Sequence, residues 1–315
     1  MAIMKKKNII NLVKYYTEKN DVGFRNEAYE IAKDFDKSGD YQLAEYLMSL
    51  LSNVNTFVPQ SIENKSDYFE KIEGHEDLLL LPDVITHDLL GIVNAVERHI
   101  GINKFLFQGA PGTGKTEAVK QLARILSRDI YMVNFSSIID SKLGQTQKNL
   151  AEMFDEINGF VQPDKVIVLF DEIDAIALDR TSSNDHREMG RVTSSLLKCF
   201  DRVNENVVII ATTNLYHYFD KALLRRFDSI IDFNRYTDDD LMEVAEKILD
   251  RYLDKLKLGN RDIRLFRKIM KLTQEKLYPG DLKNIIKTSV AFSDADDGTD
   301  YFRRLYYAIC GEKAE

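Results

Sequence analysis

Between residues 104 and 233 the sequence alternates short apolar runs with amphipathic stretches. The apolar runs are KFLFQG (104–109), IYMVNF (130–135), VIVLF (166–170), NVVIIATTN (206–214) and SIIDF (229–233). Residues 117–126 and 190–200 lie between such runs and place their apolar side chains at helical spacing. Strands that are apolar on both faces and alternate with helices are typical of a parallel sheet covered by helices. The sequence therefore predicts an α/β fold with helices on both faces of the sheet.

Helical patterns flank this region on both sides. Residues 1–55 contain three sets of apolar side chains at helical spacing, separated by the breaks KNDVG and KSGD. Residues 56–77 lose this periodicity and are interpreted as a linker. After the α/β core, which we assign to residues 78–236, the strands stop and residues 237–315 predict a helical lid domain.

Composition limits the classes of protein to which this chain can belong. The net charge of −8 argues against a surface built mainly to neutralise nucleic-acid phosphates. Cys199 and Cys310 are too few for a disulfide framework and favour reduced thiols in a cytoplasmic compartment. The basic start of the chain lacks the apolar core of a signal peptide, and no uninterrupted apolar stretch reaches membrane-spanning length, so we expect no membrane segment.

A phosphate-binding motif follows the first apolar run of the core. The sequence GAPGTGKT (109–116) matches the pattern G-x-x-x-x-G-K-[ST], with a predicted strand before it and a helix after it. Glycines let backbone N–H groups close around phosphate oxygens, and the helix N-terminus adds partial positive charge. Lys115 would neutralise the β- and γ-phosphates of a nucleotide, and Thr116 would hold Mg²⁺. The predicted nucleotide contacts are Gly109, Pro111, Gly112, Thr113, Gly114, Lys115 and Thr116.

Acidic and amide side chains follow two other predicted strands. Asp171 and Glu172 come directly after VIVLF, and Asn214 follows VVIIATT. Parallel strands deliver their carboxyl ends to one edge of the sheet, where Asp171 can bind the magnesium ion and Glu172 can activate a water molecule. Asn214 is suited to hydrogen-bond a γ-phosphate or that water, although an Asn after a strand is also a common turn former. Asp174 is expected to cap the helix that follows.

A pair of arginines, Arg225 and Arg226, lies in FDKALLRRFDSI. Each guanidinium could pair with acids on its own surface, or one could reach the γ-phosphate of a nucleotide bound by a neighbouring subunit.

Taken together, GAPGTGKT, VIVLFDEID, ATTN and ALLRRFD occur in the order and approximate spacing of an AAA+ ATPase, and the chain resembles the AAA branch of that family. The resemblance implies ATP and Mg²⁺ as ligands and a ring, usually a hexamer. It also implies roles for the residues just named: Asp171 and Glu172 as the Walker B pair, Asn214 as sensor 1, and Arg225 and Arg226 as arginine fingers acting in trans. Val84 and Ile85 lie where relatives line the adenine pocket, although both could equally be core residues.

Three positions depart from the pattern of the family. LLRRFD lacks the Pro-Gly pair of LLRPGRFD, which leaves open which arginine is the finger. Asp281 lies where other branches carry an ATP-sensing arginine, and Lys283 is a weak substitute. Lys142 takes the aromatic position of the pore loop of unfolding motors, before Leu143 and Gly144, so threading of a substrate is less firmly implied than ATP hydrolysis.

The expected function is an ATP-driven ring that remodels or unfolds a protein partner. The alternative is an ATP-dependent switch that controls an associated effector, such as a protease, without threading it. Residues 1–50 look like the helical domain of short bacterial AAA ATPases, some of which are encoded beside a subtilisin-like protease, but a generic helical adaptor fits equally well. A helicase or clamp loader fits the fold but not the acidic charge.

Overall fold

The structure is a computed structural model, and it describes most of the chain in two compact units, Met1–Ser66 and Asp67–Glu315. The described residues are 6–17, 20–37, 40–52, 66–72, 80–139, 144–177, 186–256, 261–294 and 297–311. Among these residues, no helix combines the length and the apolar composition that crossing a membrane requires.

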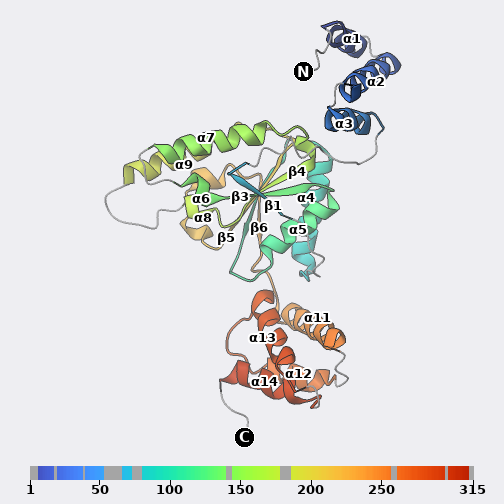
Figure 1. The fold of residues 1–315 in the computed structure, drawn as a ribbon. Coiled ribbons are helices and arrows are strands. Elements are labelled where there is room, and N and C mark those ends of the chain that lie inside the picture. The colour runs from blue at the N-terminus through green and yellow to red at the C-terminus, as the bar shows by residue number, and fades with distance from the viewer. Residues whose placement is uncertain are drawn as a thin grey trace. The chain divides into compact units, whose positions relative to one another are not determined.

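The first unit is a set of three helices, α1 (Lys6–Thr17), α2 (Asp21–Lys37) and α3 (Tyr41–Ser52) (Figure 1). Its small core is built from alanines and one isoleucine, namely Ala28, Ile31 and Ala32 of α2 and Ala44 of α3. Small side chains at these positions let neighbouring helices approach closely. A hydrogen bond of 3.1 Å from Asn11 to Glu27 links α1 to α2.

A six-stranded sheet forms the centre of the second unit, in the order β1-β3-β4-β5-β2-β6. The strands are β1 (Phe69–Ile72), β2 (Lys104–Gln108), β3 (Asp129–Val133), β4 (Val166–Phe170), β5 (Val208–Thr213) and β6 (Ser229–Asp232). All neighbouring pairs are parallel except β1 and β3, which run antiparallel. The parallel α/β sheet predicted from the sequence is confirmed, and β1 adds an edge strand that was not predicted.

Helices cover both faces of this sheet (Figure 1). The helices of the core are α4 (Asp83–Glu97), α5 (Lys115–Ile125), α6 (Phe135–Ile138), α7 (Gln145–Asn158), α8 (Asp174–Ala177), α9 (His186–Phe200) and α10 (Lys221–Leu224), with short 3₁₀ turns at Pro163–Lys165 and Tyr216–Tyr218. In β2, Phe105 and Phe107 pack with α4 and α5, whereas Leu106 packs on the opposite face with α7 and α9. Because strand side chains alternate between faces, an entirely apolar strand such as β4 fills both cores at once.

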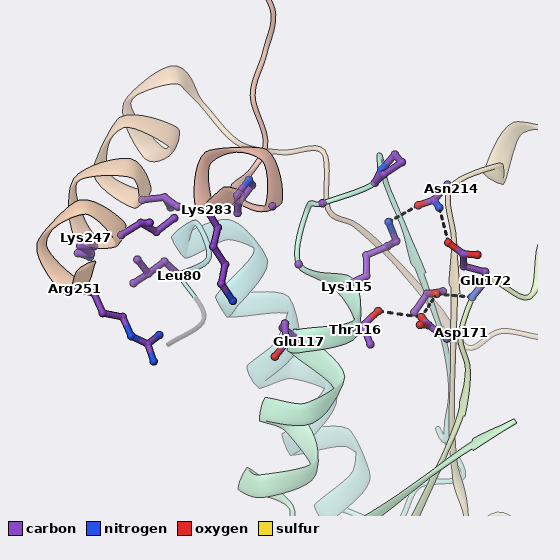
Figure 2. Close-up of a pocket in the computed structure, with 18 of the residues that line it drawn as sticks. Leu80, Lys115, Thr116, Glu117, Asp171, Glu172, Asn214, Lys247, Arg251 and Lys283 are labelled. Atoms are coloured by element: carbon purple, nitrogen blue, oxygen red, sulfur yellow. Dashed lines mark hydrogen bonds between the residues drawn. The ribbon is translucent and has the colours of Figure 1, made fainter. Parts of the chain in front are cut away.

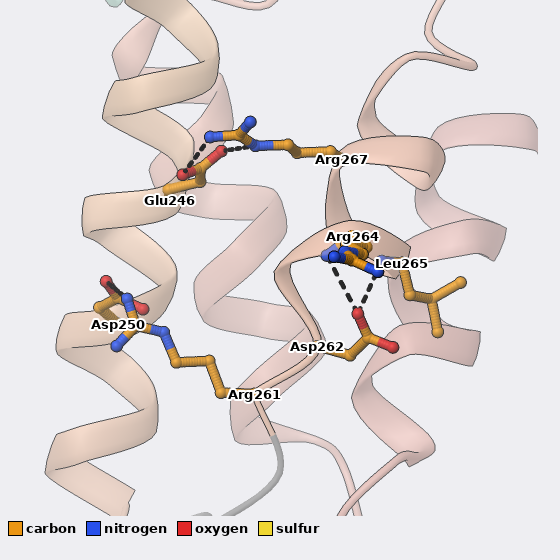
Figure 3. A network of polar contacts seen from close by, with 7 residues as sticks. All are labelled: Glu246, Asp250, Arg261, Asp262, Arg264, Leu265 and Arg267. Carbon is orange, nitrogen blue, oxygen red and sulfur yellow. Dashed lines mark hydrogen bonds and ion pairs between the residues drawn. The ribbon is translucent and has the colours of Figure 1, made fainter.

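Four helices follow the sheet: α11 (Asp238–Leu256), α12 (Ile263–Met270), α13 (Pro279–Ala291) and α14 (Asp300–Cys310). They form the helical C-terminal region that the sequence predicted to be a lid, and we refer to this region as the lid. Polar contacts join its helices (Figure 3): Glu246 of α11 accepts a hydrogen bond of 3.0 Å from Arg267 of α12, and Asp250 pairs with Arg261. Asp262 caps α12 by accepting two backbone N–H bonds of 3.0 Å. These contacts hold α11 and α12 in a fixed relation.

Candidate functional site

Three adjacent strands bring the predicted motifs to one edge of the sheet. β5 lies between β2 and β4 and is parallel to both. The glycine-rich loop follows β2, the two acids follow β4, and Asn214 follows β5. All three segments therefore leave the sheet at the carboxyl ends of neighbouring strands, which is where ligands bind in open parallel sheets.

The glycine-rich loop joins β2 to α5 and turns sharply at two glycines. Gly112 has a φ of 75° and Gly114 a φ of 94°, in the left-handed region that disfavours residues with a side chain. Gly114 is the N-cap of α5 and carries no side chain to occupy the helix N-terminus. The loop thus exposes backbone N–H groups beside the positive end of a helix dipole, the arrangement that suits a bound phosphate.

Lys115 is the first residue of α5, directly after the loop, and it is largely buried, with 8% of its surface exposed. Its ammonium donates hydrogen bonds to the carbonyl oxygens of Gly109 and Ala110, at 2.8 and 2.9 Å, and to Oδ1 of Asn214 at 2.7 Å. Burial lowers the pKa of Lys115 to about 8, against the opposing effect of nearby carboxylates, of which Asp171 is the strongest. Burying a charged ammonium costs free energy, and an anion bound beside it offsets that cost.

A hydroxyl and a carboxylate that suit a magnesium ion meet next to the loop. Thr116 donates a hydrogen bond of 3.0 Å to Oδ1 of Asp171, and Thr212 of β5 donates one of 2.7 Å to the same atom. Mg²⁺ prefers oxygen ligands in an octahedral arrangement and keeps several waters or phosphate oxygens among them. Thr116 and Asp171 fit two of these positions. Thr212 was not predicted, and it fixes the Asp171 carboxylate.

Glu172 adopts a strained backbone and is positioned by two neighbours. Its φ is 54°, in the left-handed region that non-glycine residues seldom occupy, and residues that do so cluster at functional sites. Its N–H donates to Oγ1 of Thr212 at 2.9 Å, and Asn214 donates a hydrogen bond of 3.4 Å to its carboxylate. The side chain is exposed to solvent. Asn214 therefore bridges Lys115 and Glu172 (Figure 2).

Asp174 was predicted to cap the helix that follows β4, and the structure places it at the start of that helix. It is the first residue of α8, is 3% exposed, and accepts a hydrogen bond of 3.2 Å from Thr213. Its buried carboxylate contributes to the field that acts on Lys115.

A pocket of about 390 Å³, which the lid completes, is lined on the core side by Lys115, Thr116, Asp171, Glu172, Thr212 and Asn214 and by Pro111, Gly112 and Gly114 of the loop. This volume falls within the range of about 300–1,000 Å³ of small-molecule sites. Leu80, which precedes α4, and Val244, Ile248 and Tyr252 of α11 supply apolar surface to the pocket. In Figure 2, Leu80 lies on the side away from Glu172. Three lid cations, Lys247, Arg251 and Lys283, also line the pocket (Figure 2).

The structure does not bring Val84 and Ile85 to this pocket. Val84 is 54% exposed on the outer side of α4, whereas Ile85 is fully buried in the core between α4 and the sheet. Helical spacing explains why the two residues differ in exposure, because successive residues of α4 point about 100° apart. Leu80, which precedes the helix, lines the pocket instead.

The loop is also fixed to the segments that lead into the lid. Asn234 accepts a hydrogen bond of 2.8 Å from the N–H of Ala110, and Tyr236 donates one of 2.9 Å to the carbonyl of Thr113. In the lid itself, the N–H of Gly280 donates to the carbonyl of Gly112 at 2.8 Å. None of these contacts was predicted, because each joins residues more than 100 positions apart.

Comparison with known proteins agrees with this geometry. Residues 105–235 match the model of the "ATPase family associated with various cellular activities (AAA)". The chain is 31% identical over 235 residues to an uncharacterised AAA family ATPase of Sinorhizobium fredii, covering 68% of this chain and 70% of that protein.

The chain belongs to the AAA family of ATPases.

Another relative is longer than this chain, and one solved structure shares its fold. A putative 26S proteasome regulatory subunit homologue of Methanothermobacter thermautotrophicus is 33% identical over 195 residues, which cover 61% of this chain but only 50% of that protein. A chain in the structure of the HORMA:CdnC:Trip13 complex of E. coli MS115-1 superposes with a TM-score of 0.57 at 18% identity, over 76% of this chain and 94% of that one. At such low identity, the likeness shows the fold alone.

The structure distinguishes the two arginines expected to act as fingers in an AAA ATPase. Arg226 is held by its own chain, since it donates to both carboxylate oxygens of Asp201 at 3.1 and 3.2 Å. Arg225 ends α10 and is exposed. Neither arginine lines the pocket of its own chain.

The pore-loop residues Lys142 and Leu143 lie outside the described residues. Gly144, the third residue of that segment, is the N-cap of α7 with a φ of 77°.

Proposed function

We propose that this AAA family member hydrolyses ATP with the help of Mg²⁺. The observation that carries the proposal is the chain of hydrogen bonds from Thr116 through Asp171 and Thr212 to Glu172, and from there through Asn214 to Lys115. The glycine-rich loop, Thr116 with Asp171, Glu172 and Asn214 thus line one pocket, and this arrangement supports the proposal. The apolar surface of Leu80 and α11 is suited to the adenine ring.

Each residue has a defined role in this proposal. The backbone of the loop and Lys115 would bind the β- and γ-phosphates, and Thr116 and Asp171 would hold the magnesium ion. Mg²⁺, when bound with the nucleotide, would neutralise phosphate charge. Glu172 would orient a water molecule and accept its proton as the water oxygen attacks the γ-phosphorus and the bond to ADP breaks. Asn214 would keep the Glu172 carboxylate facing that water.

The exposed arginine favours a site that is completed by a second copy. Arg226 already has a bidentate carboxylate partner, so we assign the finger to Arg225, which would enter the pocket of a neighbouring subunit. This assignment requires a ring, for which a hexamer and a cytoplasmic location are our predictions.

The energy of ATP hydrolysis would then be used to change the conformation of a protein partner. Contacts between the loop and Gly280 provide a route by which a change of nucleotide could shift the lid against the core. The resemblance to proteasome regulatory subunit homologues supports a protein as the partner, to be remodelled or unfolded. The alternative is a switch that controls an effector without threading it, and an unfolding assay with a tagged substrate separates the two.

The test of the enzymatic proposal is the substitution Glu172→Gln. It keeps the size and the hydrogen bond to Asn214 but removes the proton acceptor, so turnover should fall by about 100-fold or more while Mg·ATP binding is retained. Glu70→Gln, an exposed position on β1 outside the pocket, is the matched control and should turn over ATP like the wild type. Unchanged turnover in Glu172→Gln would remove Glu172 from its role.

A further inference from the structure

The second unit holds another cavity, separate from the pocket described above. Its volume is about 330 Å³, and it lies between the C-terminal half of α5, the turn from α5 to β3, and strand β1. The two cavities share no lining residue. We call the second one the basic groove, after its charged lining residues Lys71, Lys120, Arg124, Arg128 and Asp129.

Positive charge dominates the lining of the basic groove. Four of these side chains are cations, and one, Asp129, is a carboxylate. Lys71 pairs with Asp129 at 3.0 Å, and Lys120 pairs at 2.7 Å with Glu117, which lies outside the groove. After both carboxylates are counted, the groove keeps an excess of two positive charges, in a chain whose net charge is −8.

Two arginines carry this excess. Within the part of the chain that the structure describes, the exposed Arg124 guanidinium makes no ion pair or hydrogen bond. Arg128 is half-buried, and its Nη1 donates hydrogen bonds of 2.8 and 3.1 Å to the carbonyl oxygens of Asn206 and Val166. Carbonyl groups fix the guanidinium but do not neutralise it, and burial lowers the pKa of Arg128 against the opposing effect of Asp164. An anion bound in the groove would offset the cost of this burial.

The end of helix α5 explains only part of the cluster. The helix dipole favours a cation in the last turn, which accounts for Arg124. Lys71 lies on β1 and Arg128 precedes β3, so the dipole of α5 does not explain either of them. Ser127, which also lines the groove, has a φ of 52° just after the helix, where glycine is the usual residue. A serine is strained at this position, but it brings a hydroxyl donor that glycine lacks.

The chemistry of these donors indicates the class of ligand. Guanidinium forks, ammonium groups and a hydroxyl are the donors that bind phosphoryl oxygens. A phosphoryl group carries a charge of about −1.5 to −2 at pH 7, which matches the excess in the groove. The volume of about 330 Å³ lies at the lower end of the range for small-molecule sites, which favours a compact ligand.

We propose that the basic groove binds a small phosphorylated molecule, with Arg124 and Arg128 as its main phosphate contacts. This site goes beyond the proposed ATPase function and does not depend on it, because it uses none of the residues assigned to ATP.

Calorimetric titration with inorganic pyrophosphate, without magnesium, tests the proposal. The full chain carries Lys115→Met, so that the glycine-rich loop has lost its lysine, and we expect one pyrophosphate bound per chain. Adding Arg124→Met should weaken this binding by about tenfold or more, because a charge-assisted contact is lost. Arg98→Met is the matched control, since Arg98 is also an exposed arginine at the end of a helix but lies outside the groove.

Each outcome decides the proposal. An affinity of Arg124→Lys between those of Arg124 and Arg124→Met supports it, because lysine keeps the charge but not the fork. No binding by the Lys115→Met chain, equal affinities with Arg124→Met and Arg98→Met, or citrate binding as tightly as pyrophosphate would overturn it. If Lys115→Met does not fold, the wild-type chain is titrated, and Arg124→Met should lose one pyrophosphate site. Failure of the wild-type chain to bind Mg·ATP would refute only the proposed ATPase function.

Discussion

The close approach of Gly280 to Gly112 can be tested with a single methyl group. A Cβ added at Gly280 would lie 2.8 Å from the Cα of Gly112 and 3.2 Å from its carbonyl oxygen. Both neighbours are backbone atoms of the phosphate loop and cannot rotate away. Gly280→Ala should therefore push the first turn of α13 off the loop and break the 2.8 Å hydrogen bond between the two glycines.

The size of the effect follows from three contributions. Overpacking of a tight contact costs about 1–3 kcal/mol. Loss of one hydrogen bond adds about 1 kcal/mol. Alanine is a better helix former than glycine by up to about 1 kcal/mol, which offsets part of this cost. The net destabilisation should be about 1–3 kcal/mol.

Gly91→Ala in α4 is the control, because it makes the same change of residue in a helix with nothing within 4 Å of the new Cβ. Thermal unfolding should show Gly91→Ala at or above the wild-type Tm, and Gly280→Ala lower by about 2–8 °C. Mg·ATP affinity, measured by calorimetry, should fall by about tenfold in Gly280→Ala alone, because residues of the lid line the pocket that we propose binds the nucleotide. A Gly280→Ala protein as stable and as tight-binding as Gly91→Ala would refute the close contact.

Two further predictions concern the arginines and pH. Arg225→Ala should lose about 100-fold or more of ATP turnover with Mg·ATP affinity unchanged, whereas Arg226→Ala, which breaks a surface pair with Asp201, should keep most activity. Mixing Arg225→Ala with Glu172→Gln chains should restore turnover, because some interfaces then combine an intact base with an intact finger; no recovery would contradict action in trans. Since the pKa of Lys115 is lowered to about 8, its charged form is lost as pH rises through 8, so Mg·ATP affinity should fall above that pH in the wild type. A flat affinity between pH 7 and 9.5 would contradict this.

Local sequence patterns predicted the parts of the site that depend on local structure. The loop GAPGTGKT and the buried run ahead of Asp171 each carry their signal in consecutive residues, and the parallel sheet brings them together. Asn214 could be predicted for the same reason, because it comes directly after a buried strand of the same parallel sheet. The short antiparallel β1 carries too few residues for a periodic signal.

Contacts between distant residues could not be predicted in this way. Thr212 looks like any strand residue until the neighbouring strand places Asp171 beside its hydroxyl. Leu80 lines the pocket whereas Val84 and Ile85 do not. Which of these residues reaches the pocket depends on how α4 is placed in the tertiary structure, and local sequence patterns do not determine that placement. Asp281 and Lys283 lie in the same helix, yet Asp281 caps that helix whereas Lys283 lines the pocket. One feature of the sequence could have indicated Thr212, namely that its hydroxyl-bearing side chain lies only two residues before the predicted site residue Asn214.

The central claim is that Lys115, Thr116 and Asp171 together form a site for Mg·ATP. Calorimetric titration of the full chain with ATP in magnesium buffer at pH 7 tests it most directly. We predict saturable binding of one nucleotide per chain, lost in Lys115→Met and weakened when magnesium is chelated. Heat of dilution alone from the wild-type chain, or binding that Lys115→Met leaves intact, would contradict the account.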